Sequence, residues 1–493
     1  MTFVSRTALR DTRPRLLTKM GPSAIRRAAL LHRIMTQPLL ADLDRKHLIH
    51  PLVSFREHEK RGPTILESGH GAYLRDSEGK ELLDAFSGLW CVNVGYGRDS
   101  IVRAAAEQMA RLPYATGYFH YGSEPAIRLA ARLAELAPRS LQRVYFTLGG
   151  SDAVDSAIRY IVHYQNARGA AERKHFIALE RGYHGSSAAG SGLTALPAFH
   201  RYFDVPRPNQ HHIPCPYPYR SPVGNDPQAI ISASVKALRD KVRELGPEQV
   251  AAFFCEPVLG SGGVIVPPKG WLKAMSETCR ELGILFVVDE VITGFGRTGP
   301  LFACEAENVE PDLMTVAKGL TAGYLPMGAV LMSEAVYETI AGGAAEDVPI
   351  GHGQTYSAHP VSAAVALEVL RLYHEEGLLA NGIAQAPRFE EGLQSLLRHP
   401  LVGDARQRGL LGALELVADK ASRRRFDPAL RLSARIARTA YRNGLIFRAF
   451  ADNVLGFAPA LCCGPREYEL LFERLGRTLD QVLAEPEVRA AVA

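Results

Sequence analysis

An acid and an amine stand out in this sequence because each follows a short apolar run. Asp289 ends the run Gly283-Ile-Leu-Phe-Val-Val-Asp289, and Lys318 follows Met314-Thr-Val-Ala. The strands of a parallel sheet deliver their last residues to one edge, where ligands bind. A lysine that forms a Schiff base and an acid that keeps a pyridine nitrogen protonated are what pyridoxal phosphate chemistry requires. A plain salt bridge between two strand ends explains the pair equally well, so spacing alone leaves both interpretations open.

The elements around this pair predict an α/β fold with a large, mostly parallel sheet covered on both faces. Strand-like apolar runs alternate with helical stretches such as 151–165, and the last run is expected to be antiparallel. The runs cover residues 143–147, 175–179, 250–255, 284–288, 312–316 and 328–332.

A smaller α+β domain is expected to follow, with strands at 402–406 and 409–415 and a final helix. A hairpin signal at Tyr73–Gly79 suggests that the N-terminal segment joins this small domain. The predicted organisation is a basic extension (1–40), the joining segment (41–88), a large cofactor-binding domain (89–364) and a small domain (365–493).

Composition narrows the function classes. The formal net charge is +5 in 493 residues, which implies neither a nucleic-acid nor a membrane partner, and no apolar run is long enough to span a bilayer. The seven cysteines are scattered without CxxC pairs, which favours reduced thiols in a cytoplasmic protein. The first 35 residues are rich in arginine, with Asp11 as their sole acid. That bias suits a transit peptide, but we favour a flexible extension.

Two glycine-rich stretches need different interpretations. Gly150, Ser151 and Asp152 lie between a predicted strand and helix, where free backbone N–H groups and the helix dipole suit a phosphate. Ser151 also suits a simple helix N-cap. Gly294–Gly299 matches a dinucleotide fingerprint as a string, but Pro300 stands where the helix should begin. A conformationally demanding loop beside a ligand is the better interpretation there.

Each of the other candidate site residues is only a weak indication of function when taken alone. Tyr183 follows a strand and could stack on a flat ring, or simply pack in a turn. His184 is more often a hydrogen-bonded structural residue than an acid or base. Glu256 follows another strand, and Arg448 sits among apolar residues, as a buried ion-pair partner or a carboxylate receptor. The pair His211-His212 lacks the partner spacing of a metal site, so we expect a loop and no metal.

Taken together, the chain resembles the class III (ω) aminotransferases of pyridoxal phosphate fold type I, close to the pyruvate-using amine and ω-amino-acid transaminases. The resemblance covers nearly everything from about residue 40 onward. Its most specific stretches are Asp84-Ala-Phe-Ser-Gly-Leu-Trp90, Gly182-Tyr-His-Gly-Ser, Val288-Asp-Glu-Val-Ile-Thr-Gly-Phe-Gly-Arg-Thr-Gly299 and Ala317-Lys-Gly.

The resemblance implies a role for each candidate. Lys318 would carry the Schiff base and shuttle the proton, while Asp289 would pair with the pyridinium nitrogen. Further cofactor contacts are expected from Gly150, Ser151, Asp152, Tyr183, His184, Glu256, Val291 and Thr355. Thr355 would reach the phosphate of a neighbouring subunit, which implies a homodimer or a tetramer. Trp90, Tyr183 and Arg448 would line the substrate pocket, with Arg448 holding a carboxylate.

The expected reaction is a ping-pong transfer of an amino group from a primary amine, diamine or ω-amino acid to pyruvate or another 2-oxo acid. An aminomutase, racemase or decarboxylase on the same fold is the alternative; an NAD-dependent dehydrogenase and a binding scaffold rank behind it. Three positions depart from the family pattern. Leu148-Gly149 replaces Asn-Ser in the phosphate loop, Asp152 replaces Glu, and Ile292 stands where many 2-oxoglutarate-using members have Gln.

Overall fold

The computed structural model describes residues 40–343 and 348–492, so the predicted basic extension lies outside the described residues apart from its last position. The described residues form two compact units. The first comprises the chain up to Glu67 together with Asp76–Gly79, and the second comprises Ser68–Arg75 and everything from Lys80 onward.

The first unit contains a helix over residues 40–47 and helix α2 (Phe55–Arg61). Ser54 caps α2 by accepting a hydrogen bond from the Glu57 N–H at 3.4 Å, a usual way to satisfy the free donors at a helix start.

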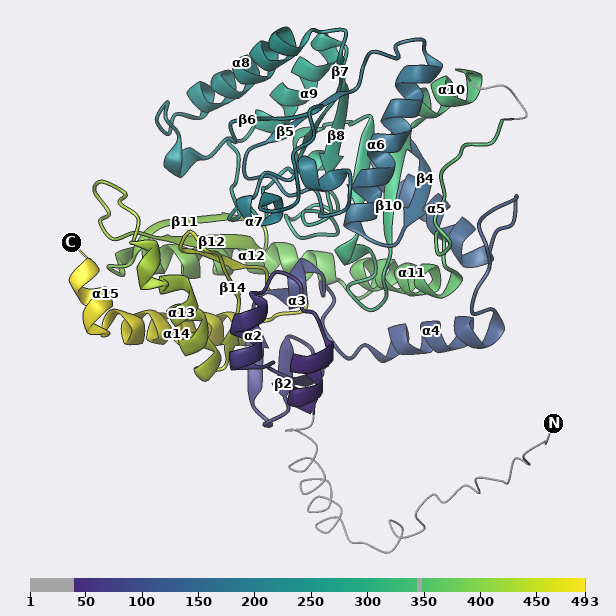
Figure 1. Cartoon of the computed structure of the whole chain (residues 1–493). Coiled ribbons are helices and arrows are strands. Elements are labelled where there is room, and N and C mark those ends of the chain that lie inside the picture. The colour runs from purple at the N-terminus through teal and green to yellow at the C-terminus, as the bar shows by residue number, and fades with distance from the viewer. Residues whose placement is uncertain (1–39, 344–347, 493) are drawn as a thin grey trace, which may run out of the picture. The chain divides into compact units, whose positions relative to one another are not determined.

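A seven-stranded sheet dominates the second unit (Figure 1). Its strand order is β4 (Leu141–Thr147), β10 (Gly328–Ser333), β9 (Leu313–Val316), β8 (Leu285–Asp289), β7 (Val250–Cys255), β5 (His175–Leu179) and β6 (Gln210–Ile213). Strands β9, β8, β7, β5 and β6 pair in parallel. Strand β10 is antiparallel to both of its neighbours, so this expectation is confirmed.

One prediction about this sheet is wrong. His211 and His212 do not lie in a loop but on β6, which pairs with β5 along its whole length. The prolines around them flank the strand rather than interrupt it, and edge strands tolerate such neighbours.

Alternate side chains of the strands enter two separate cores. Phe254 and Val287 pack on the face covered by α6 (Gly150–Ala167), whereas Phe253 and Phe286 pack on the other face. That second face is covered by α5 (Glu124–Leu136), α8 (Pro227–Leu245), α9 (Trp271–Leu282) and α11 (Pro360–Glu375). The predicted coverage of both faces is therefore confirmed.

The C-terminal part of the second unit is built on a four-stranded sheet. Its order is β11 (Val402–Arg408), β12 (Leu411–Leu416), β15 (Val454–Phe457) and β14 (Arg448–Ala449). Helices α12 (Leu378–Ser395), α13 (Leu432–Arg442) and α14 (Pro465–Leu483) accompany it. The predicted hairpin forms from β2 (Tyr73–Asp76) and β3 (Glu81–Asp84), and β13 (Leu445–Ile446) extends it. None of the described helices is long and apolar enough to cross a membrane.

Candidate active site

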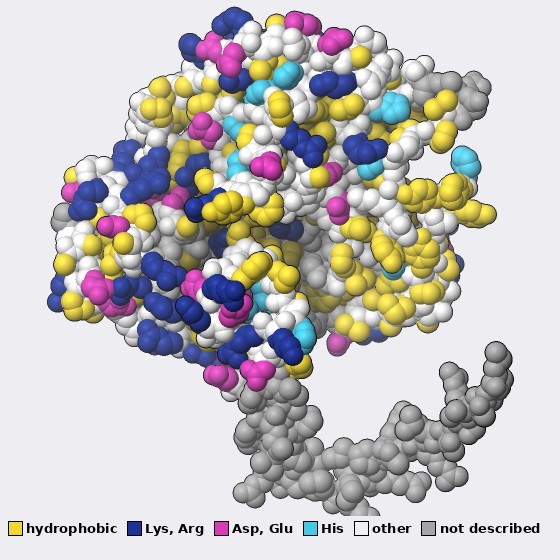
Figure 2. Space-filling view, in the orientation of Figure 1, with side chains coloured by type: hydrophobic (Ala, Val, Ile, Leu, Met, Phe, Trp, Pro, Cys, Tyr) yellow, Lys and Arg dark blue, Asp and Glu magenta, His cyan; other side chains and the backbone are white. Residues whose placement is uncertain are grey.

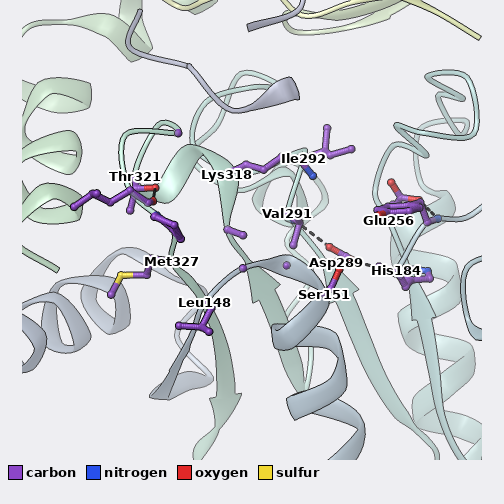
Figure 3. A pocket seen from close by; sticks show the side chains of 18 residues that line it. Leu148, Ser151, His184, Glu256, Asp289, Val291, Ile292, Lys318, Thr321 and Met327 are labelled. Carbon is purple, nitrogen blue, oxygen red and sulfur yellow. Dashed lines mark hydrogen bonds and ion pairs between the residues drawn. The ribbon is translucent and has the colours of Figure 1, made fainter. Parts of the chain in front are cut away.

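The acid and the amine meet at one cavity. Asp289 is the last residue of β8, and Lys318 lies two positions beyond the neighbouring parallel strand β9, so both side chains reach the same sheet edge (Figure 3). Both line a cavity of about 320 Å³. Within the described residues no ion pair joins them; Asp289 pairs with His184 instead. The plain salt bridge that spacing alone left open is therefore not formed.

The backbone at Lys318 supports a functional interpretation. Its φ is 39°, an uncommon value for a residue with a side chain, and such strain concentrates at active sites. Burial lowers the pKa of the Lys318 amine, although the nearby Asp289 raises it in part. The amine therefore loses its proton more readily than an exposed lysine does.

Asp289 is held by two donors. Its Oδ2 lies 2.9 Å from the His184 Nδ1, and its Oδ1 accepts the Val291 N–H at 3.1 Å. Burial lowers the pKa of His184, but the hydrogen bond and charge of Asp289 outweigh it and raise the pKa overall. The other ring nitrogen, Nε2, is buried and has no hydrogen-bond partner among residues 40–343 and 348–492. His184 thus fixes the position of the Asp289 carboxylate from within the protein.

Glu256 connects two loops beside the cavity. Its Oε1 accepts the Tyr183 N–H at 2.9 Å, and its Oε2 accepts the Gly260 N–H at 3.0 Å. The side chain is 3% exposed, and burial raises its pKa to about 7. Glu256 therefore positions the backbone of Tyr183 relative to Gly260.

The far end of the cavity is the start of α6. The lining residues there are Leu148, Gly149, Gly150 and Ser151. No side chain of the described residues caps the helix, so its first backbone N–H groups face the cavity region. The N-cap is Gly149, not Ser151, so the capping interpretation of Ser151 is wrong. Ser151 Oγ instead accepts the Ser186 N–H at 3.3 Å.

Gly150 is required by close packing at this end. A Cβ added there would lie 2.9 Å from a methyl group of Val291, another residue of the cavity wall. Asp152 is placed differently from its two neighbours: it belongs to the first turn of α6 but does not line the cavity. Burial and the nearby Asp155 raise the pKa of Asp152.

Three more predicted residues lie outside the cavity lining. Thr355 is exposed, and its carbonyl accepts the Tyr114 hydroxyl at 3.0 Å. Trp90 is buried in a cluster with Phe450 and Ile292, the last of which also lines the cavity. The Arg448 guanidinium carbon lies 5.4 Å from the centre of the Phe450 ring.

The side chains of Trp90 and Phe450 pack closely together. Their ring centres are 6.4 Å apart, and a Cβ added to Gly456 would lie 2.7 Å from Phe450 and 3.2 Å from Trp90.

Burial lowers the pKa of Arg448, and no carboxylate of the described residues forms an ion pair with it. Its charge is thus open to an external anion.

Sequence reasoning missed two features of the site. The segment Thr321–Met327 contributes five lining residues directly after Lys318. Gly323 could have indicated a turn here, and both Ala322 and Gly323 adopt positive φ in the structure. Arg297 was also missed: its fully buried guanidinium donates to the Pro459 carbonyl and to Asn93 Oδ1. It joins the loop after β8 to the segment that carries Trp90.

The stretch Gly294–Gly299 forms turns and is followed by no α-helix start, so the dinucleotide context is absent there. Phe295, Gly296 and Gly299 have positive φ, as expected of a conformationally demanding loop.

The donor set fits a flat cationic ring that carries a phosphate. Free N–H groups at the α6 start suit the phosphate, and Asp289 suits a protonated ring nitrogen. Tyr183 and Val291 add apolar surface, and Lys318 lines the same cavity.

Comparison with known proteins agrees with this chemistry. The family model described as aminotransferase class-III matches residues 55–479. The chain is 40% identical over 444 residues to putrescine–pyruvate aminotransferase of Pseudomonas aeruginosa, covering 90% of this chain and 96% of that relative. It is 36% identical over 450 residues to diaminobutyrate–2-oxoglutarate transaminase of Halomonas elongata, covering 90% and 96%.

Solved structures give the same result. An (S)-enantioselective omega-transaminase from Thermomicrobium roseum superposes with a TM-score of 0.88 at 39% identity, covering 91% of this chain and 99% of that one. The omega transaminase of Pseudomonas jessenii in complex with PMP superposes with a TM-score of 0.89 at 36% identity, with the same coverage.

Proposed function

Because the chain belongs to the class III aminotransferases and is therefore a pyridoxal phosphate enzyme, we propose that it transfers the amino group of a primary amine, diamine or ω-amino acid to pyruvate. One observation carries the proposal: Lys318 and Asp289 open onto a single cavity without forming an ion pair with each other. When bound, the cofactor supplies an electron-withdrawing ring that stabilises negative charge on the carbon next to the amine.

In this proposal Lys318 holds the cofactor and moves the proton. A lowered pKa leaves its amine free to accept a proton from the substrate carbon and return it to the cofactor side. The half-buried position of Lys318 keeps bulk water away from that transfer.

Asp289 and the α6 start are proposed to orient the ring. The Asp289 carboxylate, stabilised by His184, faces the ring nitrogen and keeps it protonated. Gly150 and Ser151 hold the phosphate through backbone and hydroxyl donors, whereas the Leu148 side chain beside them offers no donor. Val291 and Tyr183 pack against the two faces of the ring.

The substrate side is proposed to lie beyond Ile292, toward Trp90 and Arg448. Arg448 binds the carboxylate of the 2-oxo acid, supported by the absence of any carboxylate ion-paired to it within the described residues. An apolar Ile292 in place of Gln favours pyruvate over 2-oxoglutarate. The name of the Pseudomonas aeruginosa relative supports the same acceptor.

We also propose that the working form is a homodimer. Exposed apolar side chains gather over α4 (Asp99–Arg111), α5 and the loop between them (Figure 2). Phe119 is 81% exposed and Tyr121 68% exposed, and such patches are typical of interfaces. Thr355 contacts Tyr114 on this same surface, so a second copy packed there would meet Thr355.

Two measurements test this function. The purified protein, supplied with cofactor, is assayed for alanine formation from pyruvate with a panel of diamines, ω-amino acids and arylalkyl amines, with 2-oxoglutarate as the matched acceptor. Alanine formation with at least one donor is expected, and its absence across the panel would overturn the proposal. Light scattering should give the mass of a dimer, and an active monomer would refute the assembly.

All seven cysteines are free, which supports a cytoplasmic location.

A further inference from the structure

Three side chains of the first unit converge outside the cavity. Asp44 lies on the helix of residues 40–47, His50 follows that helix, and His58 lies on α2. The His50 Nε2 is 2.7 Å from Asp44 Oδ2, and the His58 Nε2 is 2.6 Å from Asp44 Oδ1. The two imidazole rings stand 4.5 Å apart at 46° to each other.

The arrangement has the chemistry of a metal site. Two imidazole nitrogens and one carboxylate oxygen, each able to act as a ligand, lie within 4.8 Å of one another. Zinc takes nitrogen and oxygen ligands at about 2.0–2.2 Å, which places neighbouring ligands of a tetrahedral site about 3.4 Å apart. The two hydrogen bonds end on different oxygens of Asp44, and each needs to open by less than about 1 Å to reach that spacing.

Burial also suits a bound ion. The Asp44 and His58 side chains are each 13% exposed, and that of His50 is 32% exposed, so the cluster has one accessible side. Hydrogen bonding and metal binding use the same Nε2 atoms. An ion would therefore replace both hydrogen bonds, with each imidazole carrying its proton on Nδ1.

We propose that Asp44, His50 and His58 bind one Zn²⁺ ion, with the remaining coordination position open to water. The ion connects the helix of residues 40–47 to α2, two elements that the hydrogen bond between Asp44 and His58 already joins. The site is independent of the proposed aminotransferase reaction, because none of its ligands lines the cavity.

The test uses the full-length protein purified without a polyhistidine tag. Metal is first removed with a chelator, and the protein is then equilibrated with zinc. Elemental analysis gives the zinc content per chain, and competition with a chromophoric chelator gives the affinity. Wild type should retain about one zinc per chain, and His58→Gln or Asp44→Asn should weaken zinc binding by at least about 100-fold. His47→Gln is the matched control, because His47 is an exposed histidine of the same segment.

Cobalt gives a second readout that does not depend on variant stability. Co²⁺ bound to the wild type should show the visible absorption bands of a low-coordinate site, as should the His47→Gln protein. Two results would each overturn the proposal. One is wild-type protein that retains no zinc and shows no cobalt bands. The other is folded His58→Gln protein that binds zinc as tightly as His47→Gln.

Discussion

Replacing Arg448 with alanine should slow the half-reaction with pyruvate and preserve the half-reaction with an amine donor that lacks a carboxylate. Its guanidinium lies against Phe450 with no carboxylate of the described residues ion-paired to it, so it is free to bind the carboxylate of pyruvate. Charge-assisted hydrogen bonds contribute about 1.5–3 kcal/mol each, and Arg448 can form two. Because Arg448 is only partly buried, solvent reduces that sum, and about 3 kcal/mol is the expected loss.

A loss of about 3 kcal/mol corresponds to a fall of roughly 150-fold in kcat/KM for pyruvate. Single-turnover absorbance measurements follow each half-reaction alone. The matched acceptor is acetaldehyde, which has hydrogen in place of the pyruvate carboxylate, and its rate should change little. The half-reaction with a donor that lacks a carboxylate should also be preserved.

The control variant is Arg438→Ala, which removes an exposed arginine from α13 and should leave both halves unchanged. Equal losses with pyruvate and acetaldehyde would show that Arg448 acts through packing rather than through the carboxylate. An unchanged rate with pyruvate would remove Arg448 from the site altogether.

Three further changes test the cavity. Lys318→Ala should abolish turnover while the cofactor still binds at the α6 end, as measured by cofactor titration; retained turnover would refute the assigned role. Gly150→Ala should weaken cofactor binding, because the new methyl group meets Val291 at 2.9 Å and overpacking costs about 1–3 kcal/mol; unchanged affinity would contradict the packing. Glu256 has a folded-state pKa of about 7, above its ordinary 4.5, so the stability of the cofactor-free protein should fall as pH rises from 4.5 to 7, by about 3 kcal/mol. In thermal unfolding, the Glu256→Gln protein should lack that fall in stability. A pH profile identical to that of the wild type would show that Glu256 does not cause it.

The large sheet was predictable because its strands carry local signals. Continuous apolar runs mark β5, β7 and β8 within a residue or two of their observed bounds, and the last strand was expected to be antiparallel. Edge strand β6 was missed because two histidines and flanking prolines hide a strand that forms only by pairing with β5. Local apolarity therefore indicates strands such as β7 and β8 well, but not a short, polar edge strand such as β6.

The cavity was predictable only in part. Strand ends indicated Asp289 and Lys318, but the hydrogen bond of Asp289 to His184 joins residues 105 positions apart and has no local signature. The same holds for Arg297, whose partner Asn93 is 204 positions away. Such contacts depend on tertiary packing, which no short window of sequence contains.

The close approach of Gly456 to Phe450 and Trp90 has a consequence for how this pocket can evolve. A Cβ at position 456 would clash with Phe450 at 2.7 Å and crowd Trp90 at 3.2 Å, so a smaller residue at position 450 removes the closer obstacle. The order of mutations therefore matters: a larger residue at 456 is accommodated more readily after Phe450 has been reduced. Laboratory libraries that vary these three positions together reach pocket shapes that stepwise substitution would discard.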